Sequence, residues 1–174
     1  MQWIAKGLPG AGHLLLFNNG DSRPADKYST VDEVVLPVDA NGRYTLAPGS
    51  KYGPDQAQWS FAAPNHTDFY SYYISGAQRL PNGNTLICSG ANGIVFEVTA
   101  QKQVVWQYNF PAFNTAAQNA PPAAARGAAP AARGGARGGG GNMARSIFRA
   151  YRYGPDFPGL KGKTLTPGKP IDSL

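Results

Sequence analysis

Few side chains in this sequence could act as nucleophiles or metal ligands. The chain holds two histidines, His13 and His66, and one cysteine, Cys88. A neutral imidazole is a good nucleophile at neutral pH, because its unperturbed pKa is about 6.5. However, His13 lies in an apolar run typical of a half-buried strand, and His66 falls in a predicted loop. Cys88 is expected to be a small buried apolar residue. A single cysteine excludes an internal disulfide, and these residues predict neither a metal site nor a cofactor.

Charge is distributed unevenly along the 174 residues, whose net charge is +6. Residues 1–113 carry a net charge of −1, residues 114–152 carry +6, and residues 153–174 carry +1. The protein is therefore a near-neutral body with one arginine-bearing stretch, which argues against a nucleic-acid-binding domain. The sequence contains no apolar run of about 18 residues, so no membrane-spanning helix is predicted. The first residues lack the pattern of a signal peptide.

The Arg-Gly pairs at Arg126, Arg133 and Arg137 allow one alternative, an RNA tether. The stretch lacks the interleaved aromatic residues that stack on bases, so a nucleic-acid partner is not expected. Salt-dependent RNA binding by the isolated 114–145 peptide would revive this alternative.

The body of the chain predicts short strands separated by turns. Its 22 Gly and 15 Pro argue against a helical bundle or a coiled coil. Apolar and β-branched runs alternate with Asn-Gly and Gly-rich turn signals. The predicted strands cover residues 12–17, 31–38, 43–46, 57–62, 70–80, 84–88, 94–99 and 103–108.

The two halves of this body look like copies of one unit. Gly12 matches Gly83, which lies 71 positions later, and Trp59 matches Trp106 near the end of each copy. A repeat of about four short strands with a late tryptophan is the pattern of a β-propeller blade. The same alignment places residues 5–7 opposite residues 77–79, at the end of an innermost strand.

The predicted fold class is therefore all-β, a partial β-propeller of about two four-stranded blades with a terminal closing strand. Residues 1–113 form the two blades, and residues 114–145 are a disordered Ala/Gly/Pro/Arg insert. Residues 146–174 form the closing strand, over residues 146–153, and an extended tail. Two blades cannot close a ring, because each buries its faces only against neighbours. The chain is expected to be the C-terminal part of a longer protein, and to need further blades or self-association.

Residues 7–15, 74–87, 96–99 and 148–153, together with Val105-Trp106, form a specific blade pattern. In this pattern the chain resembles the bacterial arylsulfate sulfotransferase family. The resemblance covers nearly everything outside residues 114–145 and implies a six-bladed propeller. It implies transfer of a sulfuryl group from a phenolic sulfate to a phenol, without a nucleotide donor, through a transiently sulfated histidine near the axis.

The resemblance places the histidine motif ahead of the segment Gln2-Trp3-Ile4, outside this chain. Ser75-Gly76 fills the place of a second family histidine. The resemblance thus implies no catalytic residue and no cofactor in this chain, with activity only in the full-length parent. It also implies a periplasmic or extracellular parent, whereas the location of this chain itself is left open.

The resemblance also implies that part of a pocket wall lies in this chain. Asn19 and Arg23 belong to a segment similar to an Asn-Gly loop that faces the family's central funnel, where Arg23 would hold a sulfate. Tyr72 and Ser75 would face the axis. These four residues are the candidate binding site for an aryl sulfate or phenol. A solvated turn is the alternative for Arg23, and packing between blades is the alternative for Tyr72.

A second function fits the same pattern. A propeller that binds a ligand or a protein without catalysis has the same fold, because fold does not fix chemistry.

Overall fold

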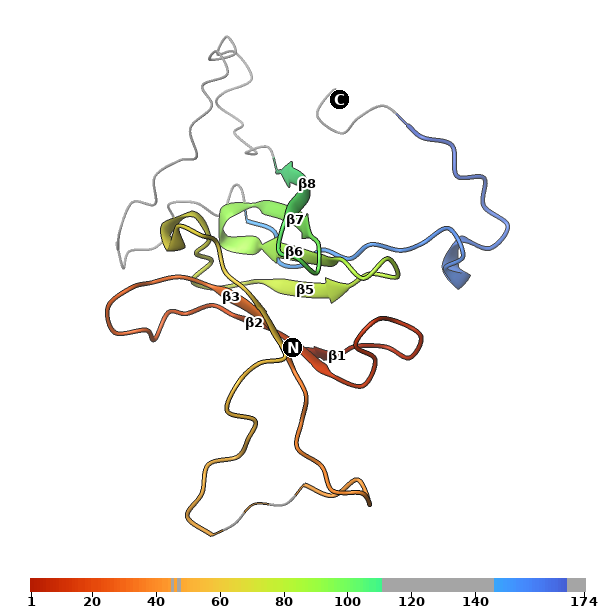
Figure 1. Ribbon diagram of the computed structural model, residues 1–174. Coiled ribbons are helices and arrows are strands. Elements are labelled where there is room, and N and C mark those ends of the chain that lie inside the picture. Colours follow the sequence, from red (N-terminus) through yellow and green to blue (C-terminus); the bar gives the residue numbers. More distant parts are fainter. Residues whose placement is uncertain (45, 47, 111–145, 169–174) are drawn as a thin grey trace.

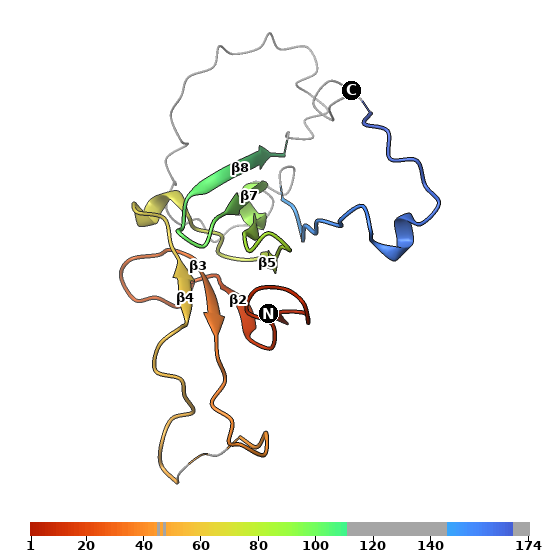
Figure 2. The same ribbon diagram turned by 45° about the vertical axis from the view of Figure 1, so that its right-hand side comes forward.

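The chain forms two four-stranded antiparallel sheets that pack against each other (Figures 1 and 2). A computed structural model describes residues 1–44, 46, 48–110 and 146–168. The all-β prediction and the two four-stranded units are confirmed, and no sheet in this described part closes on itself. The first sheet contains β1 (Gln2–Trp3), β2 (Leu14–Asn18), β3 (Thr30–Val34) and β4 (Trp59–Phe61), and the second contains β5 (Gly76–Arg79), β6 (Thr85–Ser89), β7 (Ile94–Val98) and β8 (Val104–Asn109).

Apolar side chains from both sheets meet in one core between them. Successive side chains of a strand point to opposite faces, so β7, for example, contributes its alternate residues Ile94, Phe96 and Val98 to this core. Phe69, from the connection between the sheets, has its ring centroid 5.5 Å from that of Phe61 and 5.4 Å from that of Phe96. The other buried members of the core are Ile4, Leu15, Val31, Ile87 and Val98.

The strand registers confirm that the two sheets are copies of one unit. β2 and β6 start 71 positions apart, and each is paired with the following strand in the same way. Gly12 and Gly83 both have a φ of 86°, which favours glycine. The Gly12 amide donates to the Ile4 carbonyl and the Gly83 amide to the Leu80 carbonyl, each at 3.0 Å. The predicted match of these two glycines is therefore correct.

The predicted match of the two tryptophans is also confirmed. Trp59 lies opposite Glu33 on the neighbouring strand, and Trp106 lies opposite Glu97. Each unit therefore places a glutamate of its third strand beside a tryptophan of its fourth.

The predicted alignment of the innermost strands is wrong. Trp3 pairs with Leu14 and Arg79 pairs with Thr85, so the residue equivalent to Arg79 is Trp3 and not Gly7. The first unit has a longer loop between its first two strands, with glycines at positive φ at positions 7, 10 and 12. This longer loop displaces β1 toward the N-terminus by several residues.

The strand predicted over residues 146–153 is not formed. These residues, the C-terminal segment, run along the second sheet as extended chain without a β-ladder (Figure 1). Their hydrogen bonds go elsewhere: the Ile147 amide donates to the Gly90 carbonyl at 2.9 Å, and the Arg152 amide donates to the Gln78 side-chain oxygen at 2.8 Å. The segment lies on the face of the sheet, so its backbone cannot form a ladder with that sheet.

Several other strand predictions are too long. The strand predicted over residues 31–38 ends at Val34, and the chain then projects away from both sheets before it returns at Trp59 (Figures 1 and 2). The hairpin predicted there is reduced to an isolated bridge between Val38 and Tyr44. The strand predicted over residues 70–80 covers only Gly76–Arg79, because Ile74 takes a φ of 27°. The predicted insert at 114–145 lies outside the described residues.

Candidate functional site

A polar cavity of about 190 Å³ lies where the edge strands β1 and β5 and the C-terminal segment come together. β1 contributes Gln2, the start of β5 contributes Gly76 and Ala77, and β2 contributes Leu15 and Phe17. The remaining lining residues are Met1, Asn19, Ser75, Arg149, Ala150 and Tyr151.

Two of the four predicted binding residues, Asn19 and Ser75, meet at this cavity. The Asn19 side-chain amide donates to the Ser71 carbonyl at 2.6 Å and to the Ser75 hydroxyl oxygen at 3.1 Å. Both N–H groups of Asn19 are therefore in use, and its role is to fix the loop that carries Ser75. The Ser75 hydroxyl lies 3.5 Å from the Asn19 carbonyl oxygen, a weak contact. Its proton can turn toward a ligand in the cavity.

Arg149 is the cationic side chain of this cavity, and the sequence analysis did not single it out. Within the described chain its guanidinium donates to the Tyr151 hydroxyl at 2.8 Å. A guanidinium has five N–H donors in a planar fork, so this bond leaves others for an anion. The sequence contains a signal that residues 149–152 resemble β5. Arg149-Ala150 precedes Arg152 with the same spacing as Gly76-Ala77 precedes Arg79.

Arg23 and Tyr72, the other two predicted binding residues, do not line the cavity. The Arg23 Nε donates to the Tyr28 carbonyl at 3.1 Å, and its guanidinium lies 4.0 Å from the centroid of the Tyr28 ring. Tyr72 is 57% exposed and packs on Tyr73, with ring centroids 4.5 Å apart. The structure thus brings together Asn19 and Ser75, and leaves Arg23 and Tyr72 apart from them.

Both histidines also lie away from the cavity. His13 Nδ1 lies 2.6 Å from the Glu33 carboxylate, and its side chain is partly buried, as predicted. His66 contacts Asp26 through Nδ1 and stacks on Tyr28 with ring centroids 3.7 Å apart. In the described part of the chain no group of three or more histidine, cysteine or acidic side chains could hold a metal ion.

Cys88 is a buried residue of the second sheet, as predicted. It is 1% exposed, and its thiol donates to the Ile147 carbonyl at 3.7 Å. Burial raises the pKa of this thiol to about 11, although a backbone hydrogen bond from Ala150 and the charge of Arg149 lower it slightly. At neutral pH the thiol is protonated and does not act as a nucleophile.

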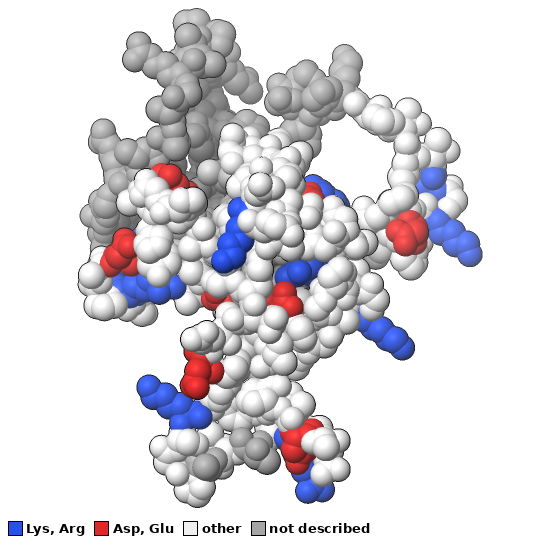
Figure 3. Space-filling model, in the orientation of Figure 1, with Lys and Arg blue, Asp and Glu red and all other residues white. Residues whose placement is uncertain are grey.

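The surface charge follows no single pattern on the face seen in Figure 3. Lysine and arginine side chains lie scattered there and alternate with acidic ones, without a continuous basic patch. Among the described residues no helix is long and apolar enough to cross a membrane. Comparisons with protein-family models, curated proteins and solved structures gave no match to the chain.

Proposed function

We propose that this chain is part of an arylsulfotransferase-like β-propeller, and that its polar cavity holds the sulfate group of an aryl sulfate. Two features support the propeller. The sheets are four-stranded antiparallel copies of one unit, and their innermost strands, β1 and β5, both line one cavity. The sequence resemblance supplies the expectation of the substrate class.

The observation that carries the proposal is the meeting of Ser75, Asn19 and Arg149 at one cavity of about 190 Å³. A planar guanidinium matches two oxygens of a sulfate, and charge-assisted hydrogen bonds are the stronger kind. Ser75 donates a further hydrogen bond, while Asn19 holds its position. Arg149 therefore acts as the principal sulfate ligand and Asn19 as a positioning residue.

The sequence resemblance implies an imidazole nucleophile for sulfuryl transfer, and no histidine lines this cavity among the described residues. In the complete protein an imidazole nitrogen from outside this chain would attack the sulfur, and the bond from sulfur to the phenolic oxygen would break. The phenolate would leave, and the oxygen of an acceptor phenol would then take the sulfuryl group as the bond from sulfur to the imidazole nitrogen breaks. The proton that the acceptor phenol gives up balances the charge of the released phenolate. The cationic cavity would offset the negative charge on the sulfuryl oxygens during both steps.

A second candidate function is ligand binding without transfer. The observation that favours it is that His13 and His66 both contact carboxylates away from the cavity. The two functions share the binding step and differ only in whether a complete protein releases phenol.

The test is calorimetric titration of the 174-residue chain with 4-nitrophenyl sulfate, with 4-nitrophenol release followed by absorbance. We expect saturable binding, no release, and loss of most of the affinity in Arg149→Ala. Arg43→Ala is the matched control, because Arg43 is an exposed turn residue outside the cavity. Absence of binding, or equal affinity in Arg149→Ala and Arg43→Ala, would contradict the proposal.

A further inference from the structure

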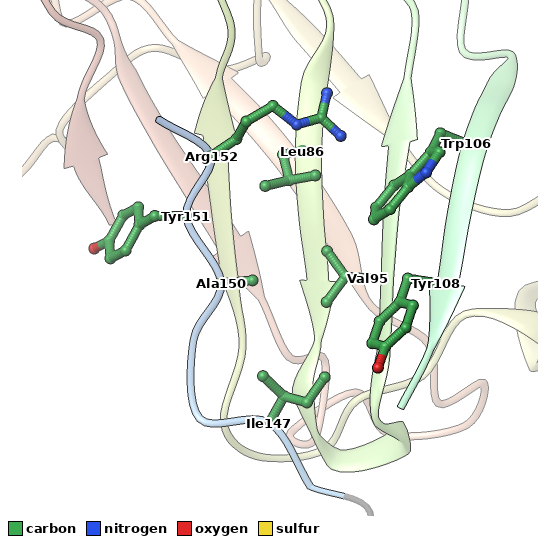
Figure 4. A pocket seen from close by; sticks show the side chains of 8 residues that line it. All are labelled: Leu86, Val95, Trp106, Tyr108, Ile147, Ala150, Tyr151 and Arg152. Atoms are coloured by element: carbon green, nitrogen blue, oxygen red, sulfur yellow. The ribbon is translucent and has the colours of Figure 1, made fainter. Parts of the chain in front are cut away.

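An apolar groove of about 330 Å³ lies on the face of the second sheet that points away from the first sheet. Its floor is formed by Leu86 and Val95, and Trp106 and Tyr108 of β8 form one wall (Figure 4). The C-terminal segment forms the other wall, where Arg152 reaches over Leu86 toward Trp106 while Tyr151 points away. The remaining lining residues are Ile147 and Ala150.

The walls of this groove repeat the contacts that join the two sheets. Arg79 of β5 donates to the buried Glu33 carboxylate at 2.5 Å, and its guanidinium lies 5.6 Å from the Trp59 ring centroid. Arg152 of the C-terminal segment donates to the Glu97 carboxylate and lies 5.2 Å from the Trp106 ring centroid.

Glu97 and Trp106 are the second sheet's equivalents of Glu33 and Trp59. Arg152 therefore contacts the second sheet in the same way as Arg79 of β5 contacts the first sheet.

A second pair of contacts joins the same elements, with the acceptor displaced by two residues. The Gln2 side-chain amide of the first sheet donates to the Ala77 carbonyl of β5 at 2.7 Å. The equivalent Gln78 of the second sheet donates to the Arg152 carbonyl at 3.0 Å. Ala77 packs into the core between the sheets, and Ala150 packs in the same way on Leu86 and its neighbours. Arg152 and Ala150 thus repeat the contacts of Arg79 and Ala77, so residues 149–152 follow the course of β5, displaced by one unit. The acceptor of Gln78 lies two residues beyond Ala150, the equivalent of Ala77.

We propose that residues 149–152 are the innermost strand of a third repeat unit, and that the groove is the docking surface for the rest of that unit. The occupant is a set of three antiparallel strands with an apolar inward face, supplied from outside the described chain. The first of these strands pairs with residues 149–152, as β6 pairs with β5. This proposal stands on the repeated contacts and does not depend on sulfate binding.

The groove needs an occupant of this kind because the same surface on the first sheet has one. There, Ile87, Phe96 and Val98 of the second sheet cover the first sheet and complete the core. On the second sheet, Trp106 is still 44% exposed. The Tyr108 hydroxyl is buried, and no described residue forms a hydrogen bond with it. Glu97 is already paired with Arg152, so the occupant has no charge to neutralise.

The test inserts a second copy of residues 80–110 between Arg152 and Tyr153 of the full chain, in the register that residues 80–110 have after Arg79. In the inserted copy the tryptophan equivalent to Trp106 is changed to Phe, so that the peptides differ in mass. Hydroxyl-radical footprinting then reports the reactivity of Trp106. Trp3, which is 56% exposed on the first sheet, is the internal reference.

We expect Trp106 to lose reactivity until it matches the half-buried Trp59, while Trp3 is unchanged. A matched insertion carries Ser at the positions equivalent to Ile87, Phe96 and Val98 and is expected to leave Trp106 reactive. Undiminished reactivity in the first insertion overturns the proposal. So does equal protection in the second insertion, or an insertion that unfolds the chain. Protection of Trp106 in the original chain that grows with concentration would instead identify a second copy as the occupant, and would also overturn it.

Discussion

Arg79 of β5 and Glu33 of β3 form a buried ion pair between the two sheets, with Nη2 and Oε2 2.5 Å apart. Their side chains are 8% and 7% exposed. His13 Nδ1 contacts the other oxygen of the same carboxylate at 2.6 Å, so the charge is held from both sheets. A buried ion pair is favourable only when the positions of its two charged groups match closely. This contact therefore fixes the position of the second sheet relative to the first.

Removal of Arg79 should destabilise the fold strongly. The variant Arg79→Met leaves the Glu33 carboxylate buried with only His13 beside it, and we expect a loss of about 3 kcal/mol in the free energy of unfolding. Urea denaturation measures this loss. The control is Asp26→Asn, which breaks the exposed pair with His66 and should cost below about 1 kcal/mol. Equal losses in the two variants would show that the pair between the sheets is not special.

Cys88 should report whether the C-terminal segment is docked. With a pKa of about 11, only about one thiol in a thousand is ionised at pH 8. Reaction with a disulfide reagent at pH 8 should therefore be slow in the original chain. Arg152→Ala removes the contact with Glu97 and should accelerate the reaction many-fold, because the segment that covers the thiol is released. Lys161→Ala, in the exposed tail, should leave the rate unchanged. An original chain that reacts as fast as a free peptide thiol would refute this account of Cys88.

Glu97 should make the stability depend on pH in acid. Burial alone would raise the pKa of Glu97, but hydrogen bonds from Asn84, Arg152 and Asn82 outweigh burial and lower the pKa below its ordinary 4.5. The unfolded chain therefore binds a proton more readily than the folded chain. The stabilising contribution is complete above pH 4.5 and is lost as the pH falls through the folded pKa.

The measurement compares urea unfolding of the original chain and Glu97→Gln between pH 7 and pH 3. The advantage of the original chain should shrink as the pH falls. A difference that is constant, or that grows in acid, would mean that the carboxylate is not held in its charged form.

Asn19 should affect the cavity only through Ser75. Asn19→Ala removes the donors to the Ser71 carbonyl and the Ser75 hydroxyl, which should cost about 1–2 kcal/mol of stability. The affinity for 4-nitrophenyl sulfate should fall less than in Arg149→Ala, because the cation remains. Asn41→Ala, in an exposed turn, should change neither quantity. An affinity loss as large as that of Arg149→Ala would make Asn19 a direct ligand.

The sequence was sufficient for the repeat and for the strands that repeat most closely. The glycine turns at Gly12 and Gly83 and the late tryptophans Trp59 and Trp106 identify equivalent positions, and the structure places them in equivalent registers. It was insufficient for β1, because several loop lengths fit the same turn signals and only hydrogen-bond partners distinguish them.

The candidate site was predicted only in part. Asn19 and Ser75 meet at the cavity, but the alternating residues 146–153, which include Arg149, predict only a closing strand. An alternating pattern predicts extended chain equally well for a paired strand and for a segment that lies on a sheet face. Which of the two forms, and so which side chains meet, depends on contacts made far along the chain, such as that between Arg152 and Gln78.

The binding of an aryl sulfate in the polar cavity is tested most directly by an NMR titration of the ¹⁵N-labelled chain with 4-nitrophenyl sulfate. We expect the largest shifts at the amides of Ser75, Gly76 and Ala77 and at the Arg149 side-chain Nε–H, with saturation at one common affinity. Shifts that never saturate, or that are largest at exposed cations such as Arg43, would contradict a site at this cavity.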